Sequence, residues 1–422
     1  MKNILIIILT SFTLTVSAQY DKFFENKTLR IDFYHSGNFE HEYYRPDELI
    51  EKAGWAGSKV NLIDTFNYGK FRIMVYDKAS DLLIYSRGFS SIFAEWRTTK
   101  EGHGACGNYQ ETMMVPYPKN IIKVLYQSRD SLNVWNTIAE DEIDPKKAEI
   151  TKPKKAKAET IKLQYSGDPS VKLDIAIIAD GYTKNDKEKM LKDFESFKNS
   201  ILSCSPYDKN KDKINIWGVA TVSIESGITS PNDSIFKKTI LKSSFNGINS
   251  DRYILTVENK TLQDLLADTP YDQIVIMCNT TKYGGGGIYN FYCTVAAGNK
   301  VAPYLFQHEF GHAFAGLADE YYTSEVSVEN FYPSKIEPWE PNITTLSNFA
   351  AKWKSMVADS VAIPTKVDDK YMCTVGVYEG GGYMAKSVYR PYIDCTMKSV
   401  KINAFCPVCK RSIEQMIEFY SH

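Results

Sequence analysis

Short runs of alternating or aromatic residues, separated by turn residues, characterise the chain from about residue 29 to residue 131. Such runs occur at residues 29–34, 71–76, 82–85 and 121–126. They predict β-strands, and several short strands between turns are typical of an antiparallel β-sandwich. Residues 46–52, which begin with Pro46, interrupt the pattern and are predicted to form a helical turn.

The composition changes abruptly after these runs. Residues 144–157 are crowded with Lys, Pro and Ala and contain no aromatic side chain. Such a segment cannot bury enough apolar surface to offset the entropy lost on ordering, so we interpret it as a linker or an exposed strand edge. We therefore expect a boundary near residue 150, between a β-sandwich domain of residues 19–150 and a second domain of residues 151–422.

The second part of the chain has an α/β pattern. Residues 173–179 are almost continuously apolar, which is typical of a strand covered on both faces. Thr183 is then a predicted N-cap, with Asp186 at the third helical position, of an amphipathic helix of about five turns. The apolar stripe expected to pack in the core consists of Met190, Leu191, Phe194, Phe197 and Ile201. Further strands are predicted at residues 214–222, 252–257 and 274–278, and a short helix at 261–267. The expected fold class is therefore α+β or α/β.

Four consecutive glycines at residues 284–287 lead into an aromatic run at residues 288–295. A phosphate-binding loop would require Gly-Lys-Ser/Thr and a helix directly after the glycines, and this pattern is absent. We interpret the glycines as a flexible loop that feeds a strand at residues 288–295. That strand could hold an extended peptide, main chain to main chain.

The amino terminus predicts export. Lys2 precedes an apolar stretch at residues 4–16, and Val16-Ser17-Ala18 supplies the small residues that a signal peptidase reads before Gln19. We therefore expect a cleaved signal peptide of residues 1–18 and a secreted, periplasmic or otherwise exterior protein. No later segment approaches the roughly 20 apolar residues of a membrane span. A formal net charge of −1 gives no reason to expect nucleic acid or a membrane surface as partner.

Four of the eight cysteines lie near the carboxyl end, at Cys373, Cys395, Cys406 and Cys409. In an oxidising compartment we expect them to form one or two disulfides. The alternative is a closed zinc site that uses Cys406 and Cys409. The usual cysteine-only zinc site pairs two Cys-x-x-Cys units, however, and this chain has one.

The most informative segment is His-Glu-Phe-Gly-His at residues 308–312. Residues four apart on a helix point the same way, so His308 and His312 can bind one metal ion through their imidazole nitrogens. Glu309 projects close to that ion and suits the general base that activates a water molecule. Two histidines on one helix face can also be ordinary core residues, but two of only six in the chain fall in this motif.

Gly316 is predicted to end this helix, because glycine readily adopts the left-handed conformation of a helix terminus. Asp319 follows three residues later and can turn back toward the metal as a third ligand. Glu320 is the next residue and remains an alternative third ligand.

Residues 308–321 resemble the metzincin arrangement of a two-histidine helix, a glycine turn and a third ligand. The glycine comes one residue later than usual, and the third ligand would be Asp319 instead of His. This variant resembles peptidase family M64, the metallopeptidase family named for immunoglobulin A peptidases. The resemblance covers about residues 165–415. The further segments that carry it are residues 178–183, 215–219 and 225–227 upstream, a methionine turn at 394–397 and a closing cysteine pair in 405–409.

This resemblance implies a metzincin-like zincin domain that binds Zn²⁺ through His308, His312 and Asp319. Glu309 would act as base and acid, and Met397 would lie beneath the metal. The implied activity is a secreted zinc endopeptidase that acts on protein or peptide substrates.

Other readings remain open. Tyr383 is a candidate for the hydroxyl that stabilises the oxyanion. A zinc amidase or deacetylase acting on cell-wall or glycan amides would use the same chemistry. A non-catalytic exported binding protein with a structural zinc is the third reading. Two features argue against a structural zinc: Glu309 suits a catalytic base, and no fourth ligand is indicated that would close the site.

Overall fold

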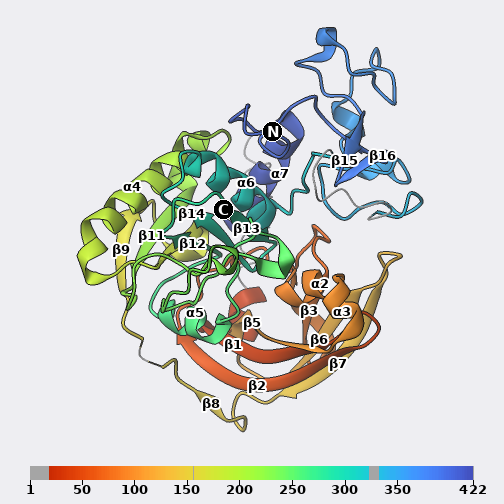
Figure 1. Ribbon diagram of the computed structural model, residues 1–422. Coiled ribbons are helices and arrows are strands. Elements are labelled where there is room, and N and C mark those ends of the chain that lie inside the picture. Colours follow the sequence, from red (N-terminus) through yellow and green to blue (C-terminus); the bar gives the residue numbers. More distant parts are fainter. Residues whose placement is uncertain (1–18, 155, 323–331, 422) are drawn as a thin grey trace, which may run out of the picture.

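The computed structural model describes residues 19–154, 156–322 and 332–421, so the expected signal peptide at residues 1–18 lies outside the described residues. The described chain is a mixed α/β structure with several sheets (Figure 1). It contains two large hydrophobic cores. Within these ranges no helix has the length and apolar character needed to cross a membrane.

Two four-stranded sheets make up the N-terminal part, with the strand orders β5-β1-β2-β8 and β4-β3-β6-β7. The first contains β1 (Phe24–Gly37), β2 (Glu42–Ala53), β5 (Gly107–Pro118) and β8 (Ile150–Thr151). The second contains β3 (Phe71–Asp77), β4 (Leu82–Phe89), β6 (Ile122–Arg129) and β7 (Trp135–Ile143). Leu29 and Val115 from one sheet share a core with Ile73 and Val124 from the other, so the sheets pack face to face. The alternation of buried and exposed side chains along each strand creates this shared core.

The prediction of a helical turn at residues 46–52 is wrong, because these residues lie in β2. Pro46 stands opposite Phe33, where the pairing between β1 and β2 is irregular. A proline without a backbone N–H is tolerated at such a position. Further along, β8 pairs in parallel with residues of β2 near Ile50 and so occupies the edge of this sheet. Ile150 and Thr151, within the lysine-rich segment of residues 144–157, thus form an edge strand. A linker or an exposed strand edge was expected for this segment.

A six-stranded sheet forms the centre of the C-terminal part, with the order β13-β14-β12-β10-β11-β9. Its strands are β9 (Glu159–Gln164), β10 (Leu173–Asp180), β11 (Ile214–Ala220), β12 (Gln273–Cys278), β13 (Gly285–Ile288) and β14 (Tyr292–Ala296). The four inner strands are parallel, while β9 and β13 run antiparallel to their neighbours at the two edges. Every residue of β10 is buried, as its continuous apolar run predicts.

Two predicted strands differ in the structure. Residues 288–295 form the end of β13, a turn and most of β14, because the chain reverses after Ile288. Residues 252–257 make only isolated bridges, such as Tyr253 to Gly285 and Leu255 to Ser244. Periodicity alone cannot separate a strand from an extended loop that packs beside a sheet.

The long predicted helix is α4 (Lys187–Ser203). Thr183 and Asp186 form the expected capping box, in a short 3₁₀ turn that precedes the helix. Of the predicted apolar stripe, Leu191 is exposed and the other four side chains are buried. Further helices are α2 (Ile92–Trp96), α3 (Lys100–Gly104), α5 (Asn259–Leu265), α6 (Ala302–Ala315) and α7 (Pro407–Tyr420). A hairpin of β15 (Tyr378–Gly381) and β16 (Met384–Arg390) lies between α6 and α7 in sequence.

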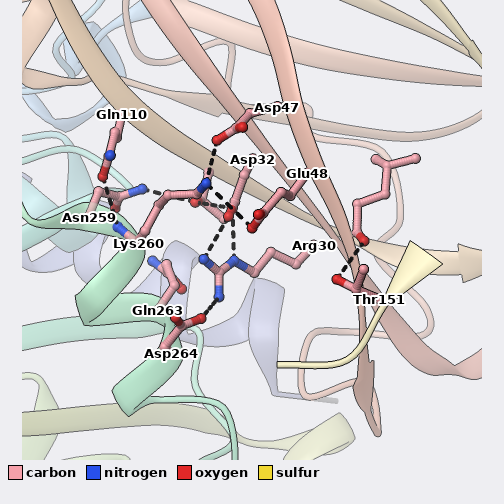
Figure 2. Close-up of polar contacts among 12 residues, drawn as sticks. Arg30, Asp32, Asp47, Glu48, Gln110, Thr151, Asn259, Lys260, Gln263 and Asp264 are labelled. Carbon is pink, nitrogen blue, oxygen red and sulfur yellow. Dashed lines mark hydrogen bonds and ion pairs between the residues drawn. The ribbon is translucent and has the colours of Figure 1, made fainter. Parts of the chain in front are cut away.

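Charged side chains fasten α5 to the sheet that contains β1 and β2 (Figure 2). Arg30 is buried, binds both carboxylate oxygens of Asp32, and donates to Asp264 of α5 at 2.6 Å. Lys260 of α5 reaches Asp47 of β2 at 2.5 Å. Because Arg30 is paired on both sides, its buried charge is compensated, and the contact ties the two parts of the molecule together.

His35 provides a second buried charged contact, inside the N-terminal part. Its Nδ1 lies 3.1 Å from Glu111 and its Nε2 lies 2.7 Å from Glu42. Burial alone would lower the pKa of His35, but the two carboxylates outweigh it and raise this pKa to about 9. A protonated His35 therefore bridges β1 to its neighbours β5 and β2.

This bridge predicts that the N-terminal part loses stability in alkaline solution. The pKa of His35 is higher in the folded state than its ordinary value of 6.5, so its contribution is complete below pH 6.5 and is lost as the pH rises through 9. We expect the free energy of unfolding to fall by up to about 3 kcal/mol over this range. Denaturant titrations at several pH values measure it. His35→Gln should flatten the pH profile, whereas His41→Gln, at an exposed position, should keep the wild-type profile. An unchanged slope in His35→Gln would contradict the assignment.

Candidate metal centre

The helix α6 carries both histidines of the predicted motif and is buried over most of its length. Its Phe306 ring stacks on Phe197 of α4 with the ring centres 4.9 Å apart. The helix ends at Gly316, which adopts the left-handed conformation with φ 62°, as predicted. A β-carbon there would also lie 2.9 Å from the ring of Trp339. Both the turn and the close packing therefore require glycine.

Backbone carbonyl groups orient the two imidazole rings. His308 Nδ1 lies 3.0 Å from the carbonyl oxygen of Thr396, and His312 Nδ1 lies 2.5 Å from that of Leu317. A carbonyl oxygen can only accept, so each Nδ1 must carry the hydrogen. In the neutral rings each Nε2 therefore keeps its lone pair, and the two Nε2 atoms lie 3.2 Å apart.

Asp319 completes this convergence. Its Oδ1 lies 3.1 Å from His308 Nε2 and 3.3 Å from His312 Nε2. Among the described residues this buried oxygen has no hydrogen-bond donor. Its Oδ2 accepts a hydrogen bond from the hydroxyl of Tyr383. Three acceptor atoms thus face one point, with the carboxylate held from behind.

These three atoms fit a metal ion. With metal–ligand bonds of about 2.0–2.1 Å and tetrahedral angles, the ligand atoms of a zinc site lie about 3.3 Å from one another. The electrostatics agree: burial alone would lower the pKa of His312, but the carboxylate of Asp319 raises it to about 9. The pocket thus favours a positive charge at this point, which a metal cation supplies.

Glu309 lies on the more open side of the site. Its carboxylate is within 4.8 Å of the histidine nitrogens, yet the residue is only half-buried. Burial raises the pKa of Glu309 above its ordinary value, while the nearby histidines oppose this shift. A carboxylate with a raised pKa beside a metal position is a suitable proton acceptor.

Glu320 points away from the histidines, although it follows Asp319 directly. Its Oε1 accepts from Asn342 Nδ2 at 3.0 Å and from the Cys409 thiol at 3.2 Å. The structure therefore brings Asp319, and not Glu320, to the two histidines.

The predicted disulfides are wrong for this structure, in which all eight cysteines are free. Cys373 is exposed, whereas Cys395, Cys406 and Cys409 are buried together. The sulfur atoms of Cys395 and Cys409 are 3.9 Å apart, well beyond the roughly 2.05 Å of a disulfide bond. A fourth side chain, Glu320, joins the buried three, which sequence spacing did not indicate.

Met397 packs against the helix between the two histidines. A β-carbon on Gly311 would lie 2.9 Å from its sulfur, so the methionine packs closely on this position of α6. The carbonyl of Met397 also accepts from the backbone N–H of Glu320 at 2.8 Å. Met397 thus contacts both the helix and the loop that carries Asp319.

The glycine run at residues 284–287 is not a flexible loop, because most of it forms β13. A β-carbon on Gly287 would lie 2.2 Å from the carbonyl oxygen of Glu309 and 2.8 Å from Cβ of His312. Glycine therefore lets this edge strand lie directly against the histidine helix. The glycine run predicts a flexible loop from the sequence, but in the structure the missing side chains allow β13 to pack closely on α6.

The N-terminal part also reaches this edge strand, through residues that the sequence did not single out. The backbone N–H of Ser90 donates to the carbonyl of Tyr289 at 2.8 Å, in the turn between β13 and β14. Glu95 of α2 accepts a hydrogen bond from Tyr253 at 2.5 Å. The Tyr253 ring in turn lies against Gly286 of β13. Nothing in the local sequence around Glu95 indicates this contact, because it depends on long-range packing.

A cavity of about 470 Å³ lies elsewhere, at the junction of the two parts. Its lining includes Lys52, Trp55, Arg87 and Tyr420, and none of the four predicted site residues. The guanidinium of Arg87 donates to the Tyr420 hydroxyl inside this junction. We therefore interpret this cavity as a gap between the two packed parts. The candidate catalytic residues lie on and near α6.

Comparison with family models agrees with this architecture. A model described as IgA Peptidase M64 matches residues 161–372 and 366–417, which is more than half of the chain. The chain belongs to the IgA peptidase M64 family. A second model, described as Peptidase M64 N-terminus, matches residues 19–139, so this M64 peptidase has a separate N-terminal domain. A search of curated proteins found no match.

Family membership makes the chain a peptidase, and hence a hydrolase with a protein or peptide substrate. M64 peptidases are metallopeptidases. In the part of this M64 peptidase that the structure describes, side chains cluster in two places where a metal ion could bind. One is the group on α6, and the other is the group of Glu320 with three cysteines.

The packing of β13 against α6 predicts that Gly287→Ala damages the site. The added methyl group must displace either the strand or the helix, which costs about 1–3 kcal/mol. A shift of this kind lowers peptidase activity by about 100-fold. Activity assays and denaturant titrations measure the two effects. Gly381→Ala is the matched control, since its β-carbon would meet nothing closer than 3.6 Å. Wild-type activity in Gly287→Ala would contradict the required close approach.

Proposed function

We propose that this M64 peptidase is an exported, zinc-dependent endopeptidase with a metzincin-like catalytic domain. The observation that carries this proposal is the convergence of His308 Nε2, His312 Nε2 and Asp319 Oδ1 on one point beside Glu309. Two imidazoles and one carboxylate make a three-ligand set that leaves a fourth position open, as in catalytic zinc sites. We infer that Zn²⁺ binds there and that Asp319 is its third protein ligand.

A bound zinc ion would supply Lewis acidity, which would polarise the substrate carbonyl group and lower the pKa of the attacking water toward neutrality. The protein contributes proton transfer and orientation. Glu309 takes the proton from the attacking water and later delivers it to the leaving amine. The carbonyl groups of Thr396 and Leu317 keep both histidines in the tautomer that presents Nε2.

Tyr383 has a positioning role in this proposal. Its hydroxyl donates to Asp319 Oδ2 and so directs Oδ1 toward the histidines. The sequence also suggests this hydroxyl as a donor to the oxyanion. Its bond to Asp319 supports orientation of the carboxylate instead.

We infer that β13 is the strand along which the substrate peptide lies. The sequence suggested residues 288–295, but β14 is enclosed between β13 and β12, whereas β13 is at the sheet edge. Part of that edge is already used, since Gly285 bonds to the backbone of Arg252 and Ile254. The remaining edge passes beside α6, and an extended chain can add to it by main-chain hydrogen bonds.

We propose that residues 19–150 form the N-terminal β-sandwich domain and residues 151–422 the catalytic domain. We also propose that the protein acts outside the cytoplasm, on extracellular proteins, after removal of residues 1–18. The amino-terminal sequence supports this localisation. Sequencing the amino terminus of the protein recovered from the cell exterior should give Gln19 as its first residue.

The decisive experiment separates the base from the ligands. Glu309→Gln should lower peptidase activity by about 10²–10⁴-fold while the zinc content stays at the wild-type level. His312→Ala should lose both activity and the zinc bound at this site. Release of new amine termini from a protein mixture and elemental analysis measure the two properties. Glu188→Gln, at an exposed position on α4, is the matched control and should behave as wild type.

The roles assigned to Glu309 and the histidines would be wrong if Glu309→Gln lost zinc as completely as His312→Ala. Full activity in zinc-free protein would overturn the zinc proposal itself.

Tyr383→Phe tests the positioning role. Removing the hydroxyl that orients Asp319 should weaken zinc binding by about 10–100-fold, with activity restored at high zinc concentration. Zinc titration followed by peptidase activity measures this change. A variant that binds zinc normally but has a lower kcat would instead indicate a donor to the oxyanion. Tyr389→Phe, on the same hairpin, should leave zinc affinity unchanged.

A further inference from the structure

Four buried side chains meet beside the loop that carries Asp319, outside the site proposed above. Glu320, Cys395, Cys406 and Cys409 place one ligand atom each within 4.8 Å of all the others. They come from the loop after α6, from the turn near Met397 and from the start of α7. Each is at most 3% exposed.

The distances fit tetrahedral metal coordination. With zinc–sulfur bonds of about 2.3 Å, two thiolates of a zinc site lie about 3.8 Å apart. The sulfur atoms of Cys395 and Cys409 are 3.9 Å apart, and Cys409 Sγ is 3.2 Å from Glu320 Oε1. The thiols lie near one another without forming a bond.

Glu320 supplies a second, independent observation. Its Oε2 is buried and, among the described residues, accepts no hydrogen bond. Asn342 holds its Oε1 at 3.0 Å and is itself fixed by two bonds to Ala318. Arg390 acts on this carboxylate electrostatically, but its guanidinium donates hydrogen bonds to the carbonyl groups of Glu379 and Gly380. A buried carboxylate aimed at three thiols therefore lacks a direct cationic partner.

We propose that Glu320, Cys395, Cys406 and Cys409 form a second, structural zinc site. Three soft thiolates favour zinc over magnesium or calcium. Four protein ligands close the coordination sphere, so no position remains for water or substrate. This site goes beyond the proposed peptidase function, because it takes no part in the reaction.

The second site holds the framework of the first. Asp319 and Glu320 are adjacent, so one residue serves each site. The backbone N–H of Glu320 donates to the carbonyl of Met397, and the carbonyl of Thr396 accepts from His308. Thr396 follows the ligand Cys395 directly. A zinc ion behind the loop therefore secures both Asp319 and the carbonyl that orients His308.

Cys406 and Cys409 also form a Cys-x-x-Cys unit at the start of α7. Oxidation of these two thiols to a disulfide is the competing state, and it would prevent zinc binding. The test below distinguishes the two states, because a disulfide removes two titratable thiols.

The experiment measures zinc and thiols in the purified mature protein. We expect two zinc ions per chain and, after denaturation with a chelator, eight titratable thiols, the full number in the sequence. The double variant His308→Ala/His312→Ala should retain one zinc ion. Cys406→Ser/Cys409→Ser should also lose one zinc ion, whereas Cys204→Ser, a buried cysteine outside the cluster, should keep both.

A spectroscopic measurement avoids dependence on the folding of the cysteine variant. Cobalt(II) exchanged into His308→Ala/His312→Ala should give sulfur-to-cobalt charge-transfer absorption in the near ultraviolet. One zinc ion in the wild type together with two missing thiols would overturn the proposal. So would the absence of both metal and thiolate absorption from the double-histidine variant. If that variant kept two zinc ions, the catalytic site would be wrong and the second site would stand.

Discussion

Two hydrogen bonds from imidazole rings to backbone carbonyl groups determine what the candidate metal centre can do. His308 is held by Thr396, 88 residues away, and His312 by Leu317, five residues away. Because each Nδ1 donates, both Nε2 lone pairs face Asp319. A shift of either carbonyl would turn a ring or change its tautomer, and the three acceptor atoms would no longer converge. The chemistry therefore depends on how firmly two loops are held.

The surrounding structure supports those loops and the helix between them. Glycines in β13 allow the edge strand to approach α6 closely. The N-terminal domain bonds to the turn after β13, through Ser90 and Tyr289, and supports Tyr253 through Glu95. The accessory domain thus contacts the site through the edge strand. This arrangement gives the N-terminal domain a physical route to influence how a peptide is held.

Two adjacent carboxylates face opposite sides of one loop. Asp319 meets the histidines of α6, and Glu320 meets the cysteines beside α7. Because the two adjacent side chains leave the backbone in different directions, a single short loop can serve two buried groups. The backbone carbonyl of Met397 contacts the same loop by accepting from the N–H of Glu320. The C-terminal cysteines are therefore part of the support of the candidate metal centre.

The sequence by itself determined the features whose physical signal is complete within a few residues. These include the cap at Thr183, the buried strand β10, the left-handed end at Gly316 and the histidine pair on one helix face. It did not determine that Pro46 lies in a strand, that the glycines form β13, or that Glu320 joins three cysteines. Periodicity and capping report which face of its own element a residue occupies. Only the tertiary structure decides which distant residue meets that face, because the contacts of Glu320 and His308 span nearly ninety residues of chain.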